Sequence, residues 1–352
     1  MRTALFLTAS LLSSGCLAAE QDTNNSSNEI SSFGHNSAVI SVYHHVSDTT
    51  PASTSISPAQ FERHLEILKE QQQPVISLPK LLDDLEAGSP LPEKAVAITF
   101  DDGYESIYTT AFPLLMEAGL PFTVFISTGP IDRSQRGYMT WDQLREMVAA
   151  GVTIGNHGTE HASLLELSDE EIRNEILAAQ TAIDRELGPR AKIFAYPYGE
   201  FSLSATSILR DLGYRAFAQN SGAIGPNSNF QALPRFPLAG IYAEEAGVRQ
   251  KYLTLAFATN IPSPIDPIST SDAPMATLSF GRGNYHDEGL NCFDNGEILE
   301  LERNSTDDQL ITLKPIANPH GRRWHYICTA REIGSSRYYW YSQPWFNPQK
   351  PQ

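Results

Sequence analysis

Two adjacent carboxylates follow an apolar segment in "ITFDDGY", where Asp101 and Asp102 come directly after residues 95–100. This segment reads as a buried strand, so both acids lie where like charges repel and are costly to desolvate. They are stable there if a cation neutralises them or if they share a proton. In the alternative interpretation, one of them points to solvent and caps the following helix.

A pair of histidines in "GNHGTEHASL" supplies the second half of a possible site. His157 and His161 are four residues apart and come just after another short apolar segment. If this segment is helical, both rings face the same way. Two neutral imidazoles and one carboxylate form a metal site with open positions for water and substrate. A histidine pair alone is also compatible with an ordinary surface location.

Three motifs in order, "ITFDDGY", "GNHGTEHASL" and "FAYPYG", resemble those of the polysaccharide deacetylases of carbohydrate esterase family 4, the NodB-type deacetylases. The resemblance extends from about Val39 to Gly240. It implies a distorted (β/α)7 barrel and a hydrolase that removes acetyl groups from sugars with one divalent ion. Zinc is the default ion, and nickel or cobalt suits the same ligands.

The resemblance also implies roles for individual residues. Asp101 corresponds to the general base, whereas Asp102, His157 and His161 correspond to the metal ligands. The backbone N–H of Tyr198 corresponds to the donor that stabilises the oxyanion.

This sequence departs from the family pattern at two positions. The late L-x-H motif, which carries the general acid, is absent between Gly213 and Gly240. The early "VYHHV" is similar instead to the start of exported poly-β-1,6-N-acetylglucosamine deacetylases. That similarity makes His44 the expected acid and His45 the second choice, and strand alternation allows only one of them to face the site.

The third motif often carries an arginine that pairs with the base, but here Ala195 stands at that position. Arg235 in "LPRFPL" is the expected substitute from a later strand end; otherwise it is a surface charge. Tyr138 and Trp141 are candidates for lining the sugar groove, although a core role for Trp141 fits almost as well.

Alternating strands and helices must position these residues. Apolar segments such as 95–100 and 120–128 alternate about seven times with amphipathic helices capped by Ser57, Thr140 and Ser168. This pattern predicts parallel strands wrapped by helices. A barrel is favoured over an open sheet because no G-x-G-x-x-G motif follows the first strand.

The chain changes character after residue 260. The proline- and serine-rich residues 260–274 are predicted to be a linker between the barrel, 37–260, and a small all-β domain, 275–352. Cys292 and Cys328 are expected to form a disulfide in an exported chain, the alternative being two free thiols. The aromatic segment "SRYYWYSQPWF" suits the core of this domain better than a glycan-binding surface.

The N-terminus reads as an export signal. Residues 1–19 have the charge and apolar run of a signal peptide, and residues 20–36 read as a disordered linker. Cleavage after Ala19 would give a soluble protein, whereas lipidation of Cys16 would anchor it. The expected location is the periplasm, the outer membrane as a lipoprotein, or the medium, and the only expected membrane contact is that lipid.

The net charge of −16, from 41 acidic and 25 basic residues, makes nucleic acid an unsuitable partner. The sequence therefore predicts an exported, metal-dependent deacetylase that acts on acetylated polysaccharides, N-acetylglucosamine polymers first. An O-acetyl esterase of the acetylxylan type and a non-catalytic glycan-binding protein are the alternatives.

Overall fold

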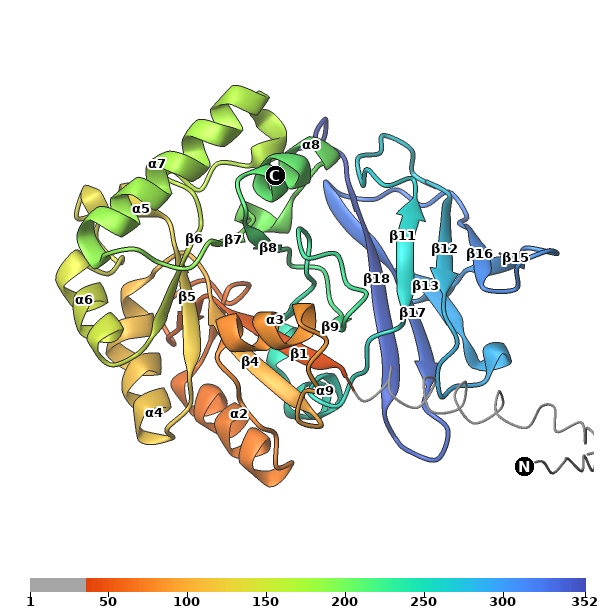
Figure 1. The fold of residues 1–352 in the computed structure, drawn as a ribbon, viewed down its shortest axis with the longest axis horizontal. Coiled ribbons are helices and arrows are strands. Elements are labelled where there is room, and N and C mark those ends of the chain that lie inside the picture. Colours follow the sequence, from red (N-terminus) through yellow and green to blue (C-terminus); the bar gives the residue numbers. More distant parts are fainter. Residues whose placement is uncertain (1–35) are drawn as a thin grey trace, which may run out of the picture.

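The computed structural model describes residues 36–352, without the side chains of residues 260–262 (Figure 1). The predicted signal peptide, Cys16 and nearly all of the predicted linker lie outside this range. No helix within it is both long and apolar enough to cross a bilayer.

The first half of the described chain forms a curved sheet whose main strands are all parallel. Their spatial order is β10–β1–β4–β5–β6–β7–β8, and β9 (Ala223–Ile224) pairs with β1 in the antiparallel sense. Residues in the long strands are buried on both faces, as expected for a parallel sheet covered by helices. The seven parallel strands are β1 (Ala38–Tyr43), β4 (Ala95–Phe100), β5 (Phe122–Ile126), β6 (Thr153–Asn156), β7 (Ile193–Ala195), β8 (Arg215–Phe217) and β10 (Phe236–Pro237).

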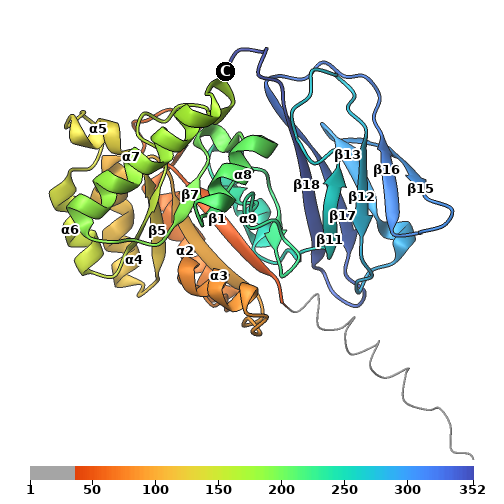
Figure 2. The same cartoon turned by 45° about the horizontal axis from the view of Figure 1, so that its top comes forward.

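Helices cover the outside of this sheet (Figures 1 and 2). Three of them begin at the predicted caps, where Ser57, Thr140 and Ser168 each form a capping box. A pair of two-residue strands, β2 (His45–Val46) and β3 (Ser55–Ile56), follows β1. The helices are α2 (Pro58–Glu70), α3 (Leu78–Glu86), α4 (Phe112–Glu117), α5 (Thr128–Asp132), α6 (Trp141–Ala149), α7 (Asp169–Leu187), α8 (Leu203–Asp211) and α9 (Glu245–Lys251).

One short segment joins the two ends of the sheet. Leu233 pairs in parallel with Phe217 of β8, and three residues later Phe236 pairs in parallel with Ser41 of β1. Arg235 lies between these two contacts. The curved sheet with its helices confirms the predicted distorted (β/α)7 barrel.

The C-terminal part forms two four-stranded sheets beside the barrel (Figure 1). Alternate side chains of their strands are buried, as in β17, and meet in a shared core. One sheet contains β11 (Thr259–Ser263), β12 (Ala276–Phe280), β16 (Leu310–Lys314) and β15 (Glu300–Arg303), and the other contains β14 (Glu297–Ile298), β13 (Asn291–Asp294), β17 (Arg323–Arg331) and β18 (Tyr338–Phe346).

The predicted linker over residues 260–274 differs from the structure at its start. Strand β11 occupies Thr259–Ser263 and pairs with β12, with a register irregularity between Asn260 and Ser263. Because backbone pairing needs no particular side chain, the proline- and serine-rich composition did not reveal this strand.

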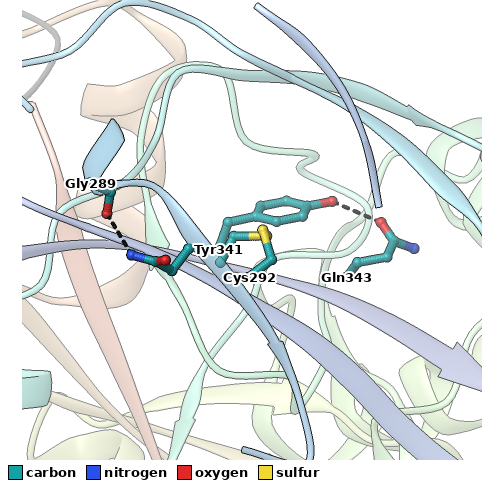
Figure 3. Close-up of a disulfide and its surroundings, with 6 residues drawn as sticks. Gly289, Cys292, Tyr341 and Gln343 are labelled. Carbon is teal, nitrogen blue, oxygen red and sulfur yellow. Dashed lines mark hydrogen bonds between the residues drawn. A yellow bond between two sulfur atoms is a disulfide. The ribbon is translucent and has the colours of Figure 1, made fainter. Parts of the chain in front are cut away.

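A disulfide joins Cys292 of β13 and Cys328 of β17, the pairing that the sequence predicts. The two residues lie directly opposite each other in the antiparallel ladder, and both are fully buried. Figure 3 shows the ring of Tyr341 beside this disulfide, with its hydroxyl donating to Gln343 Oε1 at 2.9 Å.

The aromatic residues of β18 contribute mainly to packing. Tyr339 and Trp345 are buried in the core of the β domain. Phe346 and Trp340 instead pack against residues of the barrel, including Phe201 and Phe236. The expectation of a core role therefore agrees with their burial, and part of that core lies at the junction between the two domains.

Candidate active site

The carboxyl ends of the parallel strands bring the predicted residues together. Asp101 and Asp102 follow β4, His157 follows β6, and Tyr198 lies in the turn after β7. Arg235 lies between the Leu233 bridge to the end of β8 and the start of β10, and its side chain reaches Asp101. Residues at this end of neighbouring parallel strands meet at one edge of the sheet.

Asp102 is the centre of a three-residue cluster. Its Oδ1 lies 3.1 Å from Nε2 of His157 and 3.1 Å from Nε2 of His161. One ligand atom from each residue lies within 4.8 Å of the others, which is a spacing that suits a metal ion. Asp102 has a φ of 74° and is followed by Gly103 with a φ of 84°, so the chain turns sharply to place this carboxylate.

The ring of His157 is oriented by the neighbouring strand. Its Nδ1 donates to the carbonyl of Ala195 at 2.7 Å. In the neutral ring, Nε2 then carries a lone pair and faces Asp102 Oδ1, which is also an acceptor. Neither of these two buried atoms has a hydrogen-bond partner among the described residues. Two facing, unpartnered acceptors require either a proton or a cation between them, so the residues fit a divalent ion.

The ionisation of the cluster reflects a competition between burial and the charges of neighbouring side chains. Burial alone would lower the pKa of His157, but the carboxylates of Asp102 and Asp101 outweigh burial and raise the pKa. Burial would likewise raise the pKa of Asp102, yet His157 and His161 hold the pKa of that carboxyl well below its usual range. The ligand set therefore keeps its carboxylate ionised.

The segment that carries both histidines is not helical, contrary to the geometry considered for this spacing. His157 and His161 belong to an irregular loop, and His161 has a φ of 54°. The loop folds back so that the two rings lie 4.9 Å apart between centroids. Backbone conformation, rather than helical periodicity, thus brings these imidazoles together.

Asp101 forms a fully buried ion pair with Arg235. The guanidinium donates to both carboxylate oxygens, Oδ1 and Oδ2, at 2.7 Å each, and both side chains are 0% exposed. Arg235 also donates to the Ala218 carbonyl and to Thr99 Oγ1. Burial alone would raise the pKa of Asp101, but Arg235 outweighs it and the pKa is lowered. The predicted substitute for the missing motif arginine is therefore in contact with Asp101.

We expect Arg235→Met to reduce the free energy of unfolding by about 3–5 kcal/mol at pH 7, because Asp101 would remain charged, buried and unpaired. In the unchanged protein the pKa of Asp101 is depressed, so its stabilisation is present above the unfolded pKa of about 3.9 and is lost as the pH falls through the folded pKa. In the variant the pKa of Asp101 is raised, and protonation removes the penalty. Urea unfolding in the presence of chelator should show a smaller difference in the free energy of unfolding between Arg235→Met and the unchanged protein at pH 4 than at pH 7.

His44 and His45 make different contacts, as strand alternation predicts. His44 Nε2 lies 3.4 Å from Gln219 Nε2, which is 3.5 Å from Asp101 Oδ2. His45 stacks on Tyr104 with 3.6 Å between ring centroids, and burial lowers its pKa. His44 is therefore the histidine placed on the Asp101 side of the cluster.

The turn after β7 places Tyr198 beside the cluster. The turn Pro197–Gly199 contains Tyr198 at a φ of 59°, and its ring packs edge-on against His161 with 4.5 Å between centroids. Tyr138 lies 4.9 Å from Tyr104 between ring centroids and so also lies near the site. Trp141 is partly packed against the barrel core and donates to Asp132.

Five residues near the site were not singled out from the sequence. Gln219 and Tyr104 contact His44 and His45, respectively, and Glu200 accepts hydrogen bonds from Arg322 and Arg323. Glu200 directly follows the "PYG" turn, and this position beside a functional motif was the available signal. The contacts of Gln219 depend on long-range packing and leave no local pattern.

The comparisons with known proteins agree with this geometry. Residues 88–217 match the family model described as polysaccharide deacetylase. The poly-beta-1,6-N-acetyl-D-glucosamine N-deacetylase of Escherichia coli (strain K12) is 25% identical over 249 residues, which represent 58% of this chain and 37% of that protein. The equally named protein of Staphylococcus aureus (strain MRSA252) is 27% identical over 194 residues, 51% of this chain and 67% of that protein.

Solved structures show the same barrel. IcaB from Ammonifex degensii is 26% identical with a TM-score of 0.55, and the match covers 62% of this chain and 97% of that one. The deacetylase PplD of Streptococcus pyogenes shares the fold at 22% identity, with a TM-score of 0.58 over 61% of this chain and 98% of that one. Residues 88–217 therefore match the polysaccharide deacetylase family, and the barrel that contains them has the fold of solved deacetylases.

Proposed function

We propose that this protein is a metal-dependent deacetylase that hydrolyses N-acetyl groups of N-acetylglucosamine polymers, releasing acetate and a free amino sugar. The observation that carries the proposal is a pair of buried acceptors, Asp102 Oδ1 and His157 Nε2, which have no hydrogen-bond partner in residues 36–352 as described and lie next to the Asp101–Arg235 pair. The names of the relatives from E. coli and S. aureus favour poly-β-1,6-N-acetylglucosamine as the substrate. The chain spans about a third of the E. coli protein.

Asp102, His157 and His161 would hold the divalent ion. One carboxylate and two imidazoles suit zinc first, and also nickel or cobalt. When bound, such an ion polarises an acyl carbonyl and lowers the pKa of a bound water to about 7.

Asp101 would act as the general base. In its ionised form it can accept the proton of a water molecule that attacks the acetyl carbon. Because Arg235 binds both oxygens of this carboxylate, the carboxylate is held in one orientation. Arg235 therefore acts as a positioning residue, since a guanidinium keeps its protons at neutral pH.

Two further groups would stabilise the carbonyl oxygen of the acetamide and protonate its nitrogen. The Tyr198 N–H donates to the oxygen on which negative charge develops. His44 donates a proton to the nitrogen as the carbon–nitrogen bond breaks, so that the amine leaves in neutral form. Gln219, which lies within 3.5 Å of both His44 Nε2 and Asp101 Oδ2, orients these two side chains relative to each other.

We expect His44→Ala to lower kcat by about 10²–10⁴-fold, the usual contribution of a general acid. His45→Ala should change kcat far less, because His45 stacks on Tyr104 instead of facing Gln219. Steady-state acetate release measures both variants. Equal, small effects would contradict the assignment of His44.

Acetate release with and without chelator tests the function itself. The panel should contain poly-β-1,6-N-acetylglucosamine, chitin oligomers, peptidoglycan and acetylated xylan. We expect chelator-sensitive release from the first. Release from acetylated xylan alone would indicate an O-acetyl esterase, and binding without release from any polymer would indicate a glycan-binding protein.

The proposal includes export. A signal peptide over residues 1–19 would deliver the chain to the periplasm, to the outer membrane through a lipid on Cys16, or to the medium. The disulfide between Cys292 and Cys328 suits an oxidising compartment. Mass measurement of the mature N-terminus would distinguish cleavage after Ala19 from lipidation of Cys16.

A further inference from the structure

A fully buried carboxylate connects the catalytic face of the barrel to the β domain. Glu200 directly follows the Pro197–Gly199 turn and has 0% exposure. Arg322 donates to its Oε1 through Nε at 2.7 Å and to its Oε2 through a terminal nitrogen at 3.0 Å, and Arg323 donates to Oε1 at 2.8 Å. Both arginines come from the C-terminal domain, at the start of β17.

The same carboxylate also holds the loop that carries the histidines. Ser163, two residues after His161, donates to Glu200 Oε2 at 2.5 Å. Arg322 lies 3.3 Å from Ser163 Oγ and 2.9 Å from Glu166 Oε1 on the same loop. Glu200 and Arg322 therefore join two catalytic loops to each other and to the β domain.

A second contact reaches the turn itself. The guanidinium carbon of Arg323 lies 5.5 Å from the centroid of the Tyr198 ring, and that ring packs on His161. Tyr198 has a φ of 59°, which a residue with a side chain adopts only where its surroundings impose it. The β domain supplies part of those surroundings.

We propose that Arg322 and Arg323 are positioning residues for the deacetylase reaction, so that the C-terminal β domain completes the active site. This inference rests on the proposed function. Through Glu200, the two arginines hold the Tyr198 N–H in the direction of the developing oxyanion and hold the loop of His161 beside it. A buried carboxylate without its partners would draw water or shift, and the turn would move with it.

The junction between the barrel and the β domain offers a matched control. Arg337, in the connection between β17 and β18, donates to Glu93 of the barrel at 3.0 Å, and Glu93 lies just before β4, at the opposite end of the strand from the catalytic carboxylates. Arg337→Met therefore removes an arginine–glutamate pair between the same two domains without touching the catalytic loops. Figures 1 and 2 show that the β domain lies beside the barrel, with β18 as its strand on the barrel side.

The test compares Arg322→Met, Arg322→Lys, Arg323→Met and Arg337→Met in the full chain. Acetate release gives kcat and KM, and thermal melting and metal content are measured for each. We expect kcat to fall at least tenfold in Arg322→Met and about threefold to tenfold in Arg323→Met, with KM changed less than kcat. Arg322→Lys should recover part of the loss, and Arg337→Met should keep kcat within twofold.

Several outcomes would overturn the inference. Wild-type kcat in folded Arg322→Met, or losses in Arg322→Met and Arg337→Met that simply follow their melting temperatures, would show a purely structural contact. If Arg322→Met does not fold, unchanged kcat in Arg323→Met, whose side chain is 38% exposed, overturns it equally. Failure of the proposed function is distinct, because the unchanged protein would then release no acetate.

Discussion

Asp101→Asn is expected to lower kcat by about 10²–10⁴-fold while leaving the metal content unchanged. Asparagine has nearly the shape of aspartate but cannot accept the proton of the attacking water. Asp101 is paired with Arg235 and is not a member of the Asp102 cluster, so the ligand atoms stay in place. Acetate release and metal analysis on the same preparation test both halves of this expectation.

Asp101→Asn also changes the buried contact with Arg235, so its effect on stability must be measured separately from its effect on catalysis. The asparagine amide would place an N–H group against one nitrogen of Arg235, so some loss of stability is expected as well. Thermal melting separates this effect from catalysis, because a variant that is folded at the assay temperature still lacks the base. Full activity at equal metal content would show that Asp101 is not the base.

Asp102→Ala is expected to abolish both metal retention and activity. Asp102 Oδ1 is the atom shared by the contacts to His157 and His161, and its removal leaves two imidazoles. Changing a residue that only supports a ligand typically weakens metal binding by about 10–100-fold. Removing a ligand itself should therefore weaken metal binding by more than about 100-fold. Metal content after dialysis against limiting zinc, nickel or cobalt, followed by acetate release, measures the effect.

Asp142→Ala provides the matched control for Asp102→Ala. Asp142 is also an aspartate of the barrel, but its side chain is 88% exposed on α6, and within the described part of the chain its ion pair is with Arg145, three residues later. It should retain metal and activity, since exposed pairs contribute about 0–1 kcal/mol to stability. Stoichiometric metal in folded Asp102→Ala would remove the basis of the proposed function.

The β domain has a larger role in the structure than its composition suggested. Its aromatic residues are mainly core and junction residues, which agrees with the structural interpretation of "SRYYWYSQPWF". Its arginines, however, reach Glu200 beside the catalytic turn. A barrel expressed without this domain would therefore leave Glu200 without two cationic partners.

Local features of the sequence were sufficient to predict the elements and the motif residues. Buried strands, capped helices and the motif order depend on nearest neighbours along the chain, so periodicity and turn chemistry report them directly. The adjacent carboxylates of "ITFDDG" come directly after β4, as the apolar pattern predicts. The disulfide partners are the only two cysteines in the sequence after residue 16.

Contacts between distant groups depend on the tertiary structure. The Asp101–Arg235 contact, which spans 134 residues, was expected only from the family resemblance, and the Glu200–Arg322 contact, which spans 122, was not expected at all. Each depends on how the barrel closes through Leu233 and Phe236, or on how β17 and β18 dock, and no local pattern encodes either arrangement. His161 turns toward Asp102 through a left-handed backbone conformation in a loop, although its spacing from His157 alone would equally suit a helix. Spacing along a chain constrains contacts only within one regular element, whereas contacts between elements depend on register, closure and packing.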